Sequence, residues 1–177
     1  LVFFDRVFTY RELHDQAERL AAHLRQQGVQ DGDRVILLMQ NCPQWVVAHF
    51  AILRANAVVV PVNPMNRAEE LKHYITDPDA RVAIAAADLA GDLLKANSEV
   101  PEGERLRHLV VSHYSDAIGP KAEIPPAWAD WLGARHAVPA LPGGSVSDWA
   151  DALACTGGAP AHNRGPDDLA VLPYTSA

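Results

Sequence analysis

The sequence has only two cysteines, Cys42 and Cys155, and no apolar stretch long enough to cross a lipid bilayer. Two cysteines are too few for a disulfide framework, so we expect a protein of the reducing cytoplasm. A membrane-spanning helix needs roughly 20 consecutive apolar residues. The longer apolar runs, 57–62 and 82–87, have only the length of a buried strand, so we expect no transmembrane segment.

Basic residues are also scarce, with 15 lysines and arginines against 22 acidic residues and a net charge of −7. Binding to nucleic acid depends on clustered Lys and Arg side chains that neutralise phosphates. The charge balance therefore argues against a nucleic-acid partner.

Most short catalytic motifs are missing. No Gly-x-Gly-x-x-Gly follows the first strand, and no complete Walker A motif occurs, so a dinucleotide-binding domain is not indicated. No Cys-x-x-Cys occurs, and no pair of histidines lies four residues apart on a helix, so we expect no metal site. Residues 143–147 resemble a nucleophile elbow only superficially, because Ser147 stands where the motif needs glycine. His14 and His23 are expected on the polar side of the first helix.

Residues 1–112 alternate between β-prone and helical patterns. Thr9 and Glu12 have the spacing of a capping box and predict a helix over 10–27, which Gly28 ends. Asn41 is expected to cap a second helix that ends near Asn56, a residue type that tolerates the left-handed backbone conformation. Further helices are expected after a cap formed by Asn66 with Glu69, and over 88–95. Strands are expected over 34–39, 58–62, 81–85 and 109–111, after a small hairpin formed by 2–4 and 6–8.

Strands that alternate with helices predict βαβ units. The expected fold class is therefore α/β, with a largely parallel sheet flanked by helices. Trp45 and Phe50 are expected in its core, although a role in a substrate pocket is an alternative.

Residues 113–167 form an irregular excursion rich in proline and glycine. Repeated prolines interrupt any helical or strand pattern, and only 147–154 predicts a helix, with Ser147 as its cap. Trp128 and Trp131 are expected to anchor this excursion to the main body.

Residues 168–176 predict a last strand that leads into Thr175 and Ser176. In open α/β sheets ligands dock at the carboxyl ends of strands, where hydroxyl and backbone N–H groups can hydrogen-bond phosphate oxygens. By itself this short segment favours a plain strand end with two capping residues.

Several segments resemble, in order, the N-terminal region of the AMP-forming acyl-CoA synthetases, which belong to the adenylate-forming superfamily with amino-acid adenylation domains and luciferases. The matching segments are 8–13, 32–35, 41–43 with the helix to 55, 57–64, 69–71 and 167–176. The resemblance is good over 1–112 and 165–176. The residues between these ranges match the family only in general character. Residues 61–64, Pro-Val-Asn-Pro, look most like fatty-acid–CoA or related carboxylate ligases.

The resemblance implies an enzyme that uses ATP, Mg²⁺ and CoA to convert a carboxylic acid, here a fatty acid, to acyl-CoA, AMP and pyrophosphate. Only Thr175 and Ser176 match the start of the family's phosphate loop. They are the candidate cofactor-binding residues. The resemblance assigns no catalytic and no metal-binding residue within 1–177. The rest of the loop, the adenine motif and the catalytic lysine would follow Ala177.

We therefore expect 1–177 to be one N-terminal lobe of a larger ligase, cut at both ends and inactive alone. Its remaining lobes would be its partners, and an apolar patch left exposed would favour a homo-oligomer. Two alternatives stay open: a non-catalytic interaction or scaffold domain, and another adenylate-forming enzyme that acts on amino acids or aryl acids.

Overall fold

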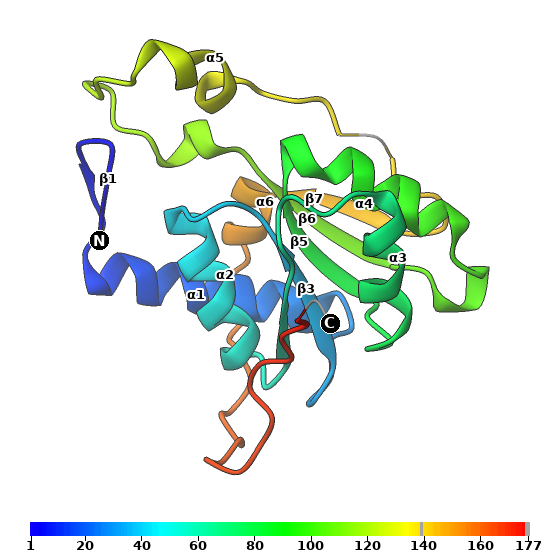
Figure 1. Ribbon diagram of the computed structural model, residues 1–177. Helices are drawn as coiled ribbons and strands as arrows, with labels where there is room; N and C mark the ends of the chain where they lie inside the picture. The colour runs from blue at the N-terminus through cyan, green and yellow to red at the C-terminus, as the bar shows by residue number, and fades with distance from the viewer. Residues whose placement is uncertain (139, 176–177) are drawn as a thin grey trace.

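The computed structural model describes residues 1–138 and 140–175 and shows a sheet of five parallel strands with helices on both faces (Figure 1). The strand order is β4-β3-β5-β6-β7. The strands are β3 (Arg34–Leu38), β4 (Val58–Pro61), β5 (Val82–Ala86), β6 (His108–Ser112) and β7 (Ser145–Asp148). The expected α/β class and parallel sheet are confirmed.

The helices cover the sheet in two groups, as Figure 1 shows. One face packs against α1 (Tyr10–Gln26), α2 (Pro43–Arg54) and α6 (Trp149–Leu153), and the other against α3 (Ala68–Thr76) and α4 (Ala87–Glu99). The strands β3, β5 and β6 are therefore covered on both faces, which explains why they are almost entirely buried and mostly apolar. Within the described residues, no helix is both long and apolar enough to cross a membrane.

Local sequence signals explain where the first two helices begin and end. Thr9 and Glu12 form the expected capping box: the Glu12 N–H donates to Thr9 Oγ1 at 3.1 Å, and the Thr9 N–H donates to Glu12 Oε2 at 2.7 Å. Such a cap stabilises a helix by about 1 kcal/mol. After α2, Asn56 adopts a left-handed φ of 61° and turns the chain into β4, as expected.

Two of the caps expected within residues 1–112 are wrong. Cys42, not Asn41, precedes the first residue of α2, and no side chain caps that helix. Pro43 at its first position has no N–H to satisfy, so a cap matters less there. Arg67, rather than Asn66, stands before α3, and the Glu70 side chain reaches back to the Arg67 N–H.

The excursion from Ser112 to Asp168 contains more structure than its prolines predict. A helix that was not expected, α5 (Pro126–Gly133), starts on two prolines, whose fixed φ suits a first turn. The expected helix over 147–154 begins only at Trp149 with Asp148 as its cap, because 145–148 form the edge strand β7 beside β6. The remaining small elements are β1 (Val2–Phe3), β2 (Arg6–Val7), η1 (Glu102–Glu104) and η2 (Tyr114–Ala117).

Candidate functional site

The segment that leads to Thr175 lies beside β4. Val59 donates its N–H to Ala170 O at 2.9 Å and accepts at its own carbonyl from the Leu172 N–H at 2.8 Å. These bonds make one parallel bridge, Val59 to Val171, in place of the strand expected over 168–174.

After this bridge the chain turns across the face covered by α3. The Tyr174 hydroxyl donates to Asp77 Oδ2 at 2.5 Å, and the Tyr174 ring packs against Tyr74 and His73, with ring centroids 4.9 and 5.2 Å away. Burial, and next the Asp77 carboxylate, raise the pKa of Tyr174. Asp77 ends α3, which runs antiparallel to the strands, so the Tyr174 side chain lies at the amino edge of the sheet. The Tyr174 hydroxyl is therefore engaged with the end of α3, and the expected position of the chain end at the carboxyl edge stays a prediction.

Thr175 is exposed and directly follows this contact. Ser176, with which it is expected to begin a phosphate loop, and Ala177 lie outside the described residues. The Asp77 carboxylate contacts the hydroxyl of the residue that precedes Thr175, Tyr174. The role of Thr175 and Ser176 as the start of a phosphate loop therefore stays a prediction.

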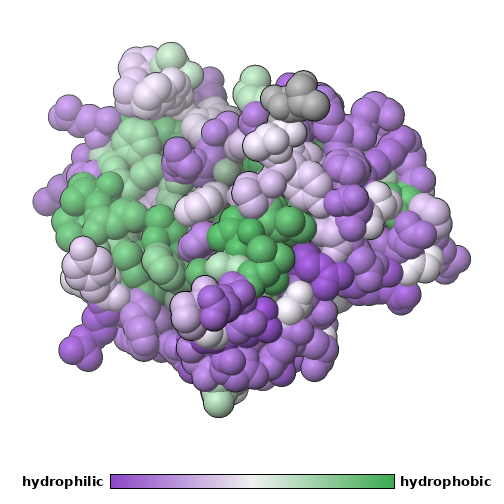
Figure 2. Space-filling model, turned by 60° about the horizontal axis from the view of Figure 1, so that its bottom comes forward, coloured by the Kyte–Doolittle hydropathy of each residue, from purple (hydrophilic) through white to green (hydrophobic). Residues whose placement is uncertain are grey.

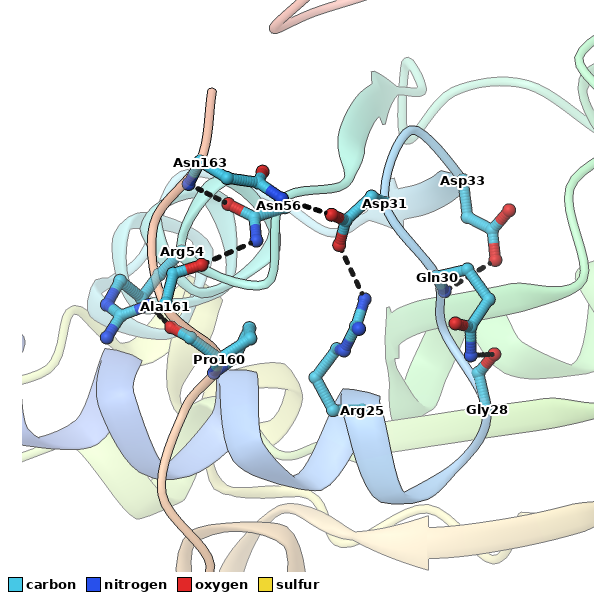
Figure 3. Close-up of polar contacts among 10 residues, drawn as sticks. All are labelled: Arg25, Gly28, Gln30, Asp31, Asp33, Arg54, Asn56, Pro160, Ala161 and Asn163. Carbon is cyan, nitrogen blue, oxygen red and sulfur yellow. Dashed lines mark hydrogen bonds and ion pairs between the residues drawn. The ribbon is translucent and has the colours of Figure 1, made fainter. Parts of the chain in front are cut away.

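A group of side chains holds residues 160–163 against the turn between α2 and β4 (Figure 3). Asn56 is 1% exposed. Its Nδ2 donates to Ala161 O at 2.9 Å, and its Oδ1 accepts from the Asn163 N–H at 3.2 Å. We call these contacts the Asn56 clasp. Asn56 thus has two roles: its side-chain amide holds residues 161 and 163, and its backbone supplies the left-handed turn.

Charged groups extend the clasp on both sides (Figure 3). Asn163 Nδ2 donates to Asp31, and this bond chiefly lowers the pKa of the Asp31 carboxyl, which also accepts from Arg25 Nη1 at 2.8 Å. Arg54 donates to the carbonyl of Pro160. Sequence reasoning found the turn at Asn56 but missed the clasp, because its partners lie more than 100 residues away.

A second feature is an apolar groove of about 770 Å³ between α1 and α2. Figure 2 shows hydrophobic side chains gathered on the corresponding side of the molecule. Phe50, which was expected in the core, is 56% exposed and lines this groove with Leu13, Val46 and Leu53. A helix of twelve residues has one face toward the sheet, and Phe50 lies on the other. The groove is suited to apolar partners.

The histidines do not lie where the sequence suggests. The expectation that His23 is on the polar side of α1 is wrong: it is buried, and its Nε2 lies 3.2 Å from Nε2 of buried His108. His108 Nδ1 lies 2.8 Å from Ser145 Oγ. Burial chiefly lowers the pKa of both rings, and that of His108 falls to about 4. Among the described residues, no group of three His, Cys, Asp or Glu side chains is placed to hold a metal ion.

Comparison with known proteins gives the family. The family model described as AMP-binding enzyme matches residues 1–177, the whole chain. This protein belongs to the AMP-binding enzyme family. The resemblance seen in the sequence is therefore confirmed.

Individual relatives are similar over part of their length. The chain is 37% identical over 113 residues to the long-chain-fatty-acid–CoA ligase of Salmonella typhimurium, which is 63% of this chain and 19% of that enzyme. It is 39% identical over 106 residues to the salicyl-AMP ligase/salicyl-S-ArCP synthetase of Mycobacterium tuberculosis, or 58% of this chain and 19% of that protein. The chain thus spans about a fifth of these relatives.

Solved structures show the same fold. The carboxylic acid reductase didomain from Segniliparus rugosus, solved in complex with AMP, superposes with a TM-score of 0.71 at 19% identity. The match covers 97% of this chain and 24% of that chain. At this identity the likeness shows the fold alone.

Proposed function

We propose that this family member is the N-terminal lobe of an ATP-dependent carboxylate–CoA ligase. The complete enzyme would convert a fatty acid, ATP and CoA to acyl-CoA, AMP and pyrophosphate, with Mg²⁺ on the nucleotide phosphates. The observation that carries this proposal is the family match over all 177 residues, together with 37% identity to a long-chain-fatty-acid–CoA ligase. Two free cysteines, of which Cys42 is buried, fit a cytoplasmic enzyme.

The lobe is proposed to be a single unit in three parts. Residues 1–112 supply the regular βα units, 113–167 cover the surface, and 168–176 lead into the phosphate loop. The Asn56 clasp supports this division, because it fixes the end of the surface excursion to the sheet just before the loop segment.

Residues 1–177 alone are proposed to be inactive. In an adenylation reaction the carboxylate must be held in line with the α-phosphorus while donors stabilise the developing negative charge. Of the two residues matched to the start of the phosphate loop, the structure describes Thr175, which is exposed. Purified 1–177 should therefore release pyrophosphate from ATP and fatty acid no faster than a control without protein. Release above that control would disprove this part of the proposal.

The gene sequence after Ala177 distinguishes the ligase from a scaffold domain. A loop rich in glycine and threonine that ends in lysine supports the ligase. A stop codon directly after Ala177 supports the scaffold. This test needs no activity measurement, so it is independent of substrate choice.

A second candidate is an aryl-acid ligase of the same family. The 39% identity to a salicyl-AMP ligase favours it as much as the first relative favours fatty acids. A panel of fatty, aryl and amino acids, tested as pyrophosphate release by the complete protein, decides between them. A fatty acid should give the highest kcat/KM if the first candidate is right.

A further inference from the structure

An aromatic pocket lies on the opposite edge of the sheet from the Asn56 clasp. It has a volume of about 300 Å³, at the small end of the range for small-molecule sites. Asn41 follows the carboxyl end of β3, and Tyr114 follows that of β6. This is the edge at which open α/β sheets bind ligands. Five aromatic side chains line it: Phe3, Phe4, Tyr114, Trp128 and Trp131.

The rings come from three separate parts of the chain. Phe4, at the tip of the N-terminal hairpin, meets Trp128 of α5 edge to face, with centroids 6.5 Å apart. Phe3 meets Phe4 at 4.8 Å. Tyr114 of η2 packs at 4.7 Å against Trp131, which is also in α5. Trp128 is 53% exposed and Trp131 39% exposed, so an incoming ligand can reach both rings.

The hairpin is strained in the conformation that brings Phe4 to this pocket. Phe4 and Asp5 form a two-residue turn with positive φ angles of 40° and 54°. Asn and Gly are preferred in such turns, and a bulky residue with positive φ is a genuine outlier. Gly119 holds the tip, since its N–H donates to Phe4 O at 3.4 Å and any side chain there would collide with Asp5. Strain of this kind is concentrated at functional sites.

A negative charge stands behind the rings. Asp88, at the start of α4, accepts a hydrogen bond at Oδ2 from Trp131 Nε1 at 2.8 Å, and its Oδ1 is buried without a hydrogen-bond partner. A carboxylate on the indole N–H makes the ring face more electron-rich. Burial chiefly raises the pKa of Tyr114, and the Asp88 carboxylate adds to this effect, so its field reaches that ring too. No Lys, Arg or His side chain is among the residues that line the described pocket.

We propose that this aromatic pocket binds a small organic cation that carries a methylated ammonium group. Aromatic faces attract such cations because the ring quadrupole is negative at the face, and several rings around one site form the cage used for quaternary ammonium groups. The Asp88 carboxylate selects against anions and supplies the opposite charge. Asp88 does not line the pocket itself; it acts on a bound cation through the Trp131 ring, whose Nε1 donates to its Oδ2.

The test is calorimetric titration of the full-length protein with choline and with neohexyl alcohol, in which a quaternary carbon replaces the nitrogen. Shape is the same, so only the charge differs. Choline should bind tighter by roughly fivefold to thirtyfold. Equal affinities would mean simple apolar burial, and no heat from choline would mean no cation site; either overturns the proposal. Free trimethyllysine, titrated alongside, identifies which cation carrying this head group is preferred.

Variants locate the binding. Trp128→Leu removes an exposed ring and Asp88→Asn removes the charge while keeping an acceptor for Trp131. Each should weaken choline binding by roughly fivefold or more. Phe50→Leu, which alters an equally exposed aromatic residue outside the pocket, should leave it unchanged. If Trp128→Leu binds choline as tightly as the original protein, or if Phe50→Leu loses as much affinity as Trp128→Leu, the cation binds outside this pocket and the proposal is overturned. Neohexyl alcohol binding by Asp88→Asn should stay at its original strength.

Discussion

Asn56 offers the sharpest test of how backbone and side chain cooperate in this fold. Replacing it with Ala removes both hydrogen bonds of the clasp and places an ordinary residue at a φ of 61°. Two hydrogen bonds contribute roughly 1–3 kcal/mol together. The left-handed conformation costs Ala roughly 1–2 kcal/mol. Asn also pays part of the cost of the left-handed conformation, so only the remainder is added by the substitution. We therefore expect Asn56→Ala to lower the free energy of unfolding by about 2–4 kcal/mol.

Asn56→Gly separates the two effects. Glycine adopts the left-handed conformation without strain, so this variant loses only the clasp and should cost about 1–2 kcal/mol. Asp79→Gly is a matched control. Asp79 also has a positive φ, of 53°, but its side chain is 58% exposed and is placed in ion pairs with Arg34 and Arg81, so we expect a change of at most about 1 kcal/mol.

Urea unfolding of residues 1–177, followed by circular dichroism, measures all three variants. Limited proteolysis adds a local readout, since loss of the clasp should speed cleavage within 156–168. If Asn56→Gly and Asn56→Ala lose equal stability, the backbone argument is wrong. If Asn56→Gly is as stable and as resistant as the original chain, the clasp contributes nothing.

Three further predictions follow from buried and exposed groups. The free energy of unfolding should fall by about 1 kcal/mol per pH unit as the pH drops from 6.5 toward 4, because His23 and His108 take up protons readily only when unfolded; a curve no flatter in His108→Gln would contradict this origin. Burial raises the pKa of the Cys42 thiol to about 11, so iodoacetamide at pH 8 should modify Cys155 first, as mass spectrometry of the digested protein can show; equal rates would refute it. Residues 1–177 should self-associate through the groove in sedimentation experiments, and Phe50→Ser should shift them toward monomer; unchanged sedimentation would exclude the groove.

The sequence predicted well those elements whose signals are local. Thr9 with Glu12 marks the start of α1, and the runs 34–38 and 82–86 are too apolar for anything but a doubly covered strand. By contrast, β7 contains two serines and an aspartate, and it becomes a strand only because β6 offers a free edge. Such tertiary effects are invisible to local pattern.

The candidate sites were predicted less well, for the same reason. Thr175 could be singled out from a motif, yet Tyr174 turns toward Asp77 because of a contact across 97 residues. The buried pair of His23 and His108 joins residues 85 positions apart. The aromatic rings were visible in the sequence one by one, but no spacing rule indicates that a hairpin, η2 and α5 bring them together.

Whether this family member belongs to a carboxylate-activating ligase is tested most directly by pyrophosphate release from the complete protein, supplied with ATP, Mg²⁺ and a fatty acid. We expect release that depends on the acid and that falls by roughly tenfold or more when Thr175 and Ser176 are both changed to Ala. If no carboxylic acid gives release, the proposed function is contradicted. If the double variant keeps the original rate, the proposed start of the phosphate loop is contradicted.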